Sequence, residues 1–286
     1  MVRFAYALVA LLVTASLTTG NATAQTLDGR LKTIVSTKKI KIAHRVDSSP
    51  FSFLDDRKQV IGYTVDICKA VVASIERQFK VTGIEIQWVP VTSQSRFDVV
   101  AKGEADMECG ASTVTLGRMK EVDFSNYVFV ESTGVAVMLK SGINSAGDLA
   151  GKKVAVIAGT SNEQAIVNRS KQTPMEVVRV QERAEAIAAL ESGKVDAYAS
   201  DKLLLVGANF KDPHAMKLLP DDLSVEPYAI ALPRGDWAMR LTVNTALSQI
   251  MRGSEIVFIF NSWFGQLGFK PGALISATFI LNGLAD

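Results

Sequence analysis

The sequence predicts a two-lobed α/β fold, and three observations indicate this class. Apolar strand-like runs alternate with helix-like runs along most of the chain, as in folds that cover a sheet with helices. The alternation occurs in two series, residues 39–109 and 153–199. Two long runs that favour β-structure, 127–139 and 225–232, flank the second series. They predict two hinge crossings between the lobes, with a ligand cleft beside them.

The pattern also sets the order of the elements. The first series predicts strands at 39–44, 85–91 and 106–109 and helices at 64–79 and 95–102. The second predicts strands at 153–157, 176–180 and 196–199, helices at 162–171 and 183–191, and a helix start at Asp201.

These elements divide the chain into a discontinuous first lobe, 25–129 with 227–286, and an inserted second lobe, 130–226. Helical patterns at 236–251 and 255–267 complete the first lobe. The apolar tail after Pro271 fits no predicted element, so we expect it either to pack on a lobe or to lack order.

The first residues predict secretion. An apolar run from Phe4 to Leu17 follows Arg3 and precedes Ala22-Thr23-Ala24, the pattern of a cleaved signal peptide covering residues 1–24. The run is shorter than the roughly 20 residues of a membrane-spanning helix. Removing this segment lowers the formal charge from +2 to +1, which argues against nucleic acid as a partner. We expect a periplasmic protein.

The two cysteines, Cys68 and Cys109, exclude a disulfide framework and a cysteine-based zinc site. We favour two buried thiols, with a single disulfide as the alternative in an oxidising compartment. The sequence predicts no metal site and no cofactor.

The stretch from Met107 to Arg118 indicates a ligand site most strongly. Its predicted strand ends on small residues, and hydroxyl groups follow at Ser112 and Thr113. We expect a helix to begin there, because amides at a helix start carry partial positive charge. Arginine grips a carboxylate through two hydrogen bonds. The stretch therefore predicts a carboxylate receptor.

Other polar residues directly follow predicted strands, where open α/β sheets bind their ligands. They are Arg45, Ser93, Arg96 and Ala111 in the first lobe, and Thr160, Arg183 and Asp201 in the second. An α-amino acid needs donors for its carboxylate and an anion for its ammonium group, and further arginines suit a second carboxylate. Some positions also have simpler interpretations: Arg183 as a solvated helix residue and Asp201 as a helix cap. Phe51 or Phe53, but not both, would serve as a pocket wall.

Several motifs resemble the periplasmic amino-acid-binding proteins of ABC importers, specifically their glutamate/aspartate-binding branch, over residues 28–268. They are His44-Arg45, Pro50-Phe51-Ser52-Phe53, Gly62-Tyr63, Val91-Thr92-Ser93-Gln94-Ser95-Arg96, Glu108-Cys109-Gly110, Phe124-Ser125 and Leu190-Glu191-Ser192-Gly193. The resemblance implies the type II periplasmic-binding-protein fold.

The resemblance also implies roles for individual residues. Thr113 and Arg118, with amides near Thr160, would hold the α-carboxylate, and Asp201 would hold the α-ammonium group. The side-chain carboxylate would lie on Arg45, Ser93 and Arg96. In two places the sequence departs from the branch. Ala111 replaces a common serine, and Arg183 stands where close relatives have a histidine, which could alter the ranking of glutamate, aspartate and glutamine.

We therefore expect a non-enzymatic, monomeric receptor that closes around L-glutamate or L-aspartate and delivers it to an ABC permease. No nucleophile elbow, His-Glu-x-x-His motif or phosphate loop is present. The alternatives are a receptor for another polar amino acid, a sensor subunit that docks on a membrane receptor, and a cyclohexadienyl-type dehydratase, which resembles the same two-lobed family and would act on prephenate.

Overall fold

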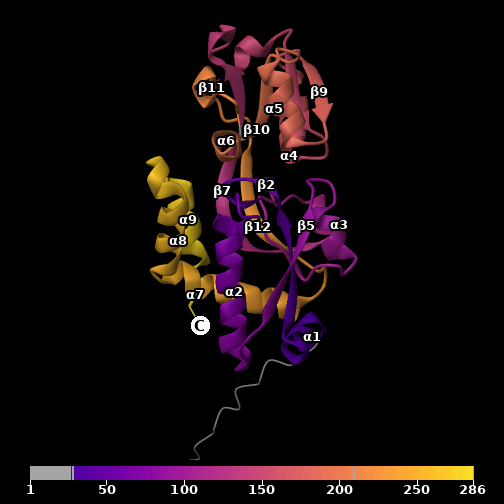
Figure 1. Ribbon diagram of the computed structural model, residues 1–286, viewed down its shortest axis with the longest axis vertical. Helices are drawn as coiled ribbons and strands as arrows, with labels where there is room; N and C mark the ends of the chain where they lie inside the picture. Colours follow the sequence, from indigo (N-terminus) through magenta and orange to yellow (C-terminus); the bar gives the residue numbers. More distant parts are fainter. Residues whose placement is uncertain (1–26, 28, 209, 286) are drawn as a thin grey trace, which may run out of the picture.

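The computed structural model describes residues 27, 29–208 and 210–285. The predicted signal peptide lies outside these residues. The molecule is elongated, with two α/β lobes stacked along its longest axis and strands β7 and β12 running between them (Figure 1). The predicted two-lobed fold is thus confirmed, whereas the boundaries at 129/130 and 226/227 stay a prediction.

The first lobe is built around a sheet in which β1 (Lys39–Arg45) lies parallel to both β5 (Glu85–Val91) and β6 (Met107–Glu108). A small antiparallel sheet follows β1, formed by β2 (Asp47–Ser48), β3 (Ser52–Leu54) and β4 (Val60–Ile61). The helices of this lobe are α1 (Gly29–Thr37), α2 (Tyr63–Phe79), α3 (Arg96–Ala101), α7 (Trp237–Arg252), α8 (Glu255–Phe264) and α9 (Ala273–Asn282).

The second lobe repeats this design. Its central strand, β8 (Lys153–Ile157), lies parallel to β9 (Glu176–Val180) and β10 (Ala197–Asp201). The short strand β11 (Met216–Leu218) pairs with β7. The helices α4 (Ser161–Ser170), α5 (Arg183–Glu191) and α6 (Lys202–Val206) belong to this lobe.

Two strands connect the lobes. Strand β7 (Asp123–Met138) pairs with β12 (Val225–Leu232) over its first part and with β10 and β11 over its second. One continuous strand order, β5-β1-β6-β12-β7-β10-β8-β9, therefore runs through both lobes. The predicted crossings at 127–139 and 225–232 correspond to these strands, and each lobe keeps its own apolar core.

Helix α2 shows how the sequence anchors the first lobe. Its apolar face recurs at helical spacing, with Ile67, Val71 and Ile75 fully buried. Cys68 lies on the same side of the helix and forms a disulfide with Cys109, directly after β6. The preference for two free thiols was wrong, because the fold brings these residues together across 41 positions of sequence.

One further expectation was wrong, and one alternative that the sequence left open, packing of the apolar tail on a lobe, is confirmed. No α-helix begins directly after Thr113, where one was predicted. The chain forms an isolated bridge between Thr113 and Tyr228 and then a single 3-10 turn, Arg118–Lys120. The apolar tail forms α9, which packs on the first lobe beside α7 and β7 (Figure 1). None of the helices in the described residues is long and apolar enough to cross a membrane.

Candidate functional site

The lobes meet around an enclosed pocket whose walls come from both. The predicted site residues that line it are Arg45, Ser93, Arg96, Ala111, Thr113, Thr160, Arg183 and Asp201. They are joined by Ser48, Ile157, Ser161, Asn162, Ser200 and Leu204. The structure thus collects most of the predicted site in one place.

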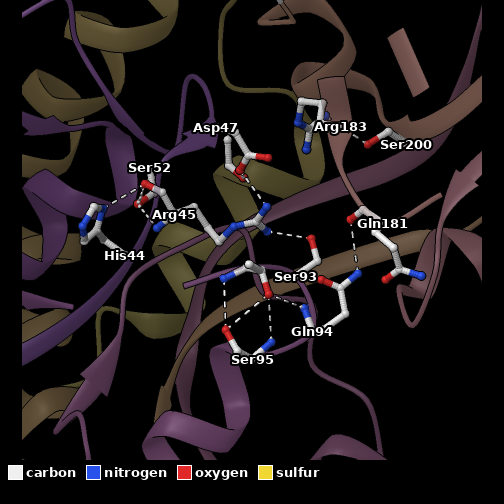
Figure 2. A network of polar contacts seen from close by, with 12 residues as sticks. His44, Arg45, Asp47, Ser52, Ser93, Gln94, Ser95, Gln181, Arg183 and Ser200 are labelled. Carbon is white, nitrogen blue, oxygen red and sulfur yellow. Dashed lines mark hydrogen bonds and ion pairs between the residues drawn. The ribbon is translucent and has the colours of Figure 1, made fainter. Parts of the chain in front are cut away.

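Arg45, the last residue of β1, is nearly fully buried at 5 % exposure. Its guanidinium donates from Nη1 to Ser93 Oγ at 2.8 Å and forms an ion pair from Nη2 to Asp47 Oδ1 at 2.6 Å. Burial lowers the pKa of Arg45 to about 10, opposed by the Asp47 carboxylate. Figure 2 shows these side chains together, with Arg183 approaching from the second lobe.

Arg96 opens α3 and is only 4 % exposed. Its guanidinium lies 4.8 Å from the centre of the Phe97 ring, but it makes no hydrogen bond or ion pair with any residue that the structure describes. Burial, followed by the charge of Arg118, lowers its pKa to about 10. A buried cation without an anionic partner in contact is costly, so this position suits an anionic ligand.

Glu108, the last residue of β6, does not line the pocket, but its charge acts on Arg45 and Arg96, which do, and the sequence analysis gave it no such role. Its carboxyl group is fully buried, and burial raises its pKa, opposed first by the charge of Arg96. A Cβ atom on Gly110 would lie 2.2 Å from Glu108 Oε1, so only glycine leaves room for this carboxyl group. An acidic residue at the end of a buried strand, directly before Cys109, was the available signal.

Thr113 and Arg118 lie at the edge of the cleft. Arg118 donates from Nη1 to the Thr113 carbonyl oxygen at 2.7 Å, and its guanidinium lies 4.9 Å from the Phe97 ring centre. It is half-buried and lines a neighbouring hollow with Thr113, Thr160 and Ser161. Arg118 is therefore fixed by a 3-10 turn and an aromatic ring, not by the predicted helix.

In the second lobe, Thr160 caps α4. Its hydroxyl accepts from the Glu163 amide at 3.2 Å and donates to the Ile157 carbonyl oxygen at 2.6 Å. The Glu163 carboxylate accepts from the Gly159 amide at 2.8 Å, so it does not form a capping box with Thr160. The start of α4 consequently faces the cleft in a fixed conformation.

Asp201 ends β10 and points its carboxylate into the pocket. It accepts from Asn162 Nδ2 at 2.9 Å and makes no capping hydrogen bond to α6. Burial and then the negative charge of Glu226 raise the pKa of Asp201 to about 6. A buried anion that gains stability from a cation is well suited to an ammonium group.

Arg183 is not a solvated helix residue. It opens α5 at 6 % exposure, and its Nη1 lies 3.3 Å from the Tyr198 hydroxyl and 3.5 Å from Ser200 Oγ. The pocket thus holds a third buried arginine besides Arg45 and Arg96.

The lobes are in contact across the cleft. Gln94 Nε2 donates to the carbonyl oxygens of Ala158 and Gln181, each at 3.3 Å. Figure 2 shows the contact with Gln181. Ser161 Oγ lies 3.3 Å from Thr113 Oγ1. These contacts join residues of opposite lobes, as in a closed conformation.

Besides Arg118, two predicted site residues, Phe51 and Ser112, do not line the pocket, and neither does Phe53, the alternative to Phe51. Phe51 is fully buried in an aromatic cluster with Tyr63, Phe129 and Tyr228, with ring centres 5.0 to 6.0 Å away. Phe53 packs on Trp263 instead, 5.8 Å between ring centres. Ser112 is fully buried behind the pocket wall. Aromatic packing in the first lobe outweighs the pocket-wall interpretation of both phenylalanines.

The fold and the polar interlobe pocket define a solute receptor. Residues 40–266 match the bacterial extracellular solute-binding proteins, family 3, and the chain belongs to this family. It is 32 % identical over 269 residues to the L-glutamate/L-aspartate-binding protein of Pseudomonas aeruginosa, covering 92 % of this chain and 89 % of that one. It is 28 % identical to the glutamine-binding protein GlnH of Bacillus subtilis, covering 86 % and 89 %.

Solved structures agree on the fold but differ in ligand. An ancestral arginine-binding protein bound to glutamine superposes with a TM-score of 0.71 at 27 % identity, covering 80 % of this chain and 98 % of that one. The ancestral amino-acid-binding protein AncCDT-1, a precursor of cyclohexadienyl dehydratase, gives 0.73 at 26 % identity, covering 82 % and 100 %. The likenesses therefore support amino-acid binding without selecting one amino acid.

Proposed function

We propose that this protein is a periplasmic receptor that closes its lobes around L-glutamate or L-aspartate and delivers it, as a monomer, to an ABC permease. The observation that carries the proposal is Arg96, whose buried guanidinium lines the pocket without an ion pair among the described residues. An acidic side chain supplies the missing anion.

The distribution of charge supports the same ligand. The pocket is lined by three arginines, Arg45, Arg96 and Arg183, and by one carboxylate, Asp201. The side-chain carboxylate would lie on Arg45, Ser93, Arg96 and Arg183. Arg118 and amides near Thr113 and Thr160 would receive the α-carboxylate, while Asp201 would receive the ammonium group. A ligand that touches both lobes stabilises the closed state by its greater affinity for it.

Isothermal titration of the ligand-stripped mature protein with glutamate, aspartate, glutamine and lysine tests the proposal. We expect saturable binding of glutamate or aspartate and much weaker binding of glutamine. Arg118→Ala should weaken every amino-acid ligand by about 30- to 100-fold, the cost of a charged hydrogen bond. Arg96→Ala should weaken chiefly the acidic ligands.

Arg240→Ala, an exposed arginine on α7, is the matched control and should change neither affinity. Equal losses for glutamate and glutamine on Arg96→Ala would exclude Arg96 as the contact for the side-chain carboxylate.

A cyclohexadienyl-type dehydratase is the second candidate, because AncCDT-1 is a structural neighbour and Asp201 has a raised pKa suited to a general acid. Incubation with prephenate, with product formation followed spectroscopically, distinguishes it. If the wild-type protein converts prephenate and Asp201→Asn abolishes this activity, the protein is a dehydratase and the receptor assignment is wrong.

A further inference from the structure

Glu226 is a buried carboxylate on β12 that lies beside the pocket without lining it, at 1 % exposure. Its Oε2 accepts a hydrogen bond from Thr113 Oγ1 at 2.7 Å. Its Oε1 accepts from Thr133 Oγ1 at 2.9 Å and is also contacted by Ser224 Oγ. Hydroxyl groups from the first lobe and from both connecting segments thus converge on one carboxylate.

The contact between Glu226 and Thr113 fixes the direction in which the Thr113 hydroxyl proton points. A threonine hydroxyl has one proton and two lone pairs, and an ionised carboxylate only accepts. The proton of Thr113 therefore points to Glu226, and its lone pairs remain for other partners. Ser161 Oγ, 3.3 Å away across the cleft, acts as such a donor. In this arrangement the Thr113 hydroxyl accepts from a ligand, so it suits an ammonium group and not the carboxylate.

A second arm runs from Glu226 to Asp201. Thr133 donates to Glu226, and its oxygen accepts from Asn162 Nδ2 at 2.7 Å. The same amide nitrogen donates to Asp201 Oδ1 at 2.9 Å. Because the donors along this arm all point toward an anion, Glu226 also fixes the amide orientation of Asn162, which holds Asp201.

We propose that Glu226 is a positioning residue that makes the pocket selective for a ligand ammonium group, by holding the Thr113 hydroxyl as an acceptor and orienting the Asn162–Asp201 pair. The inference rests on the proposed amino-acid binding but not on an acidic side chain. The ligand class it defines is α-amino acids, distinguished from hydroxy acids of the same shape.

Glu226→Gln tests this inference with a matched ligand pair, L-glutamate and L-2-hydroxyglutarate, measured by isothermal titration on the full mature chain. The glutamine side chain keeps the shape but adds an NH2 donor, which releases the Thr113 proton toward the cleft. We expect glutamate affinity to fall by about tenfold or more and hydroxyglutarate affinity to change by less than about threefold. An equal loss for both ligands, or no loss for either, would overturn the inference.

Thr133→Val and Thr133→Ser provide a second test that does not alter the Glu226 charge. Valine keeps the shape of threonine without its hydroxyl, whereas serine keeps the hydroxyl. We expect valine to lower the ratio of the two affinities by about threefold and serine to preserve it. If the folded valine variant keeps the wild-type ratio of glutamate to hydroxyglutarate affinity, the proposed arm is contradicted. This test holds even if Glu226→Gln does not fold.

The wild-type titrations separate this inference from the proposed function. Wild-type protein that binds glutamine but not glutamate overturns only the acidic assignment. The ratio is then measured with glutamine and its 2-hydroxy analogue, with the same expected outcomes. Wild-type protein that binds no α-amino acid overturns both.

Discussion

The Arg45 guanidinium forms an ion pair with the Asp47 carboxylate, only two residues further along the chain, with 2.6 Å between Nη2 and Oδ1. Asp47 is partly exposed at the edge of the site and lies toward Arg183 (Figure 2). An incoming side-chain carboxylate must therefore share Arg45 with a carboxylate of the protein. The protein itself reduces the attraction of its pocket for acidic ligands.

Asp47→Asn should consequently strengthen the binding of acidic ligands. Removing this negative charge leaves more of the Arg45 and Arg183 charge for the ligand, so we expect glutamate affinity to rise by about threefold or more. Glutamine affinity, measured in the same titrations, should change little. Asp98→Asn, an exposed partner of Lys102 on α3, is the matched control. Weaker binding of both ligands would instead identify Asp47 as a support for Arg45.

Binding should weaken in acid because of Asp201. Its pKa is raised to about 6 by burial and by Glu226. Below that pH the carboxyl group is neutral and no longer attracts an ammonium group, so affinity is retained above pH 6 and lost as pH falls. For a single group, binding at pH 5 should be about tenfold weaker than at pH 7. The other charged groups that act on Asp201 are Glu131, Arg96, Arg118 and Arg183.

Asp201→Asn checks the origin of this pH dependence. The substitution should weaken binding at pH 7 and flatten the profile between pH 5 and 7. In unliganded protein the sign reverses, because an acid with a raised pKa makes the fold less stable as pH rises from its usual pKa of about 4 to about 6, and that loss is complete at pH 7. Urea unfolding at pH 7 should thus show the unliganded variant to be more stable than wild type. A pH profile that persists in the variant would assign the titration to another group.

Much of the fold followed from local sequence. Strands at 85–91, 153–157, 176–180 and 225–232 and the helix at 183–191 lie where periodicity predicted them, since each carries its own apolar pattern. The helix after Thr113 did not form, because pairing with Tyr228 provides its hydrogen bonds instead. Such pairing between residues 113 and 228 leaves no local signal.

The site was predictable to the extent that it follows strand ends. Arg45, Arg96 and Asp201 line the pocket because parallel strands present their carboxyl ends along one edge. Glu226 could not be found this way, because its role depends on hydroxyl groups far away in sequence. The distance in space between Cys68 and Cys109, which decides whether they form a disulfide, likewise depends on the tertiary fold.

Gln94 should contribute to affinity without touching the ligand. It is exposed and donates across the cleft to Ala158 and Gln181 at 3.3 Å. Gln94→Ala removes two hydrogen bonds that form only when the lobes close, so the closed state should lose on the order of 1 kcal/mol. We expect about fivefold weaker binding of every amino-acid ligand and faster dissociation in stopped-flow fluorescence. Gln87→Ala on β5 is the control, and a loss confined to acidic ligands would exclude a closure role.

The Cys68–Cys109 disulfide should stabilise the first lobe. It ties α2 to the end of β6 across 41 residues, and closing a loop of that length lowers the entropy of the unfolded chain by an amount worth about 4 kcal/mol. The paired substitution Cys68→Ala with Cys109→Ala should lower the urea midpoint to the same extent as treating wild type with a reductant. Reductant should then have no further effect on the double variant.

Because Cys109 directly follows Glu108, we also expect the double variant to bind glutamate more weakly than oxidised wild type under conditions where both remain folded. Full retention of both stability and affinity would show that packing around α2, and not the covalent link, holds this edge of the site.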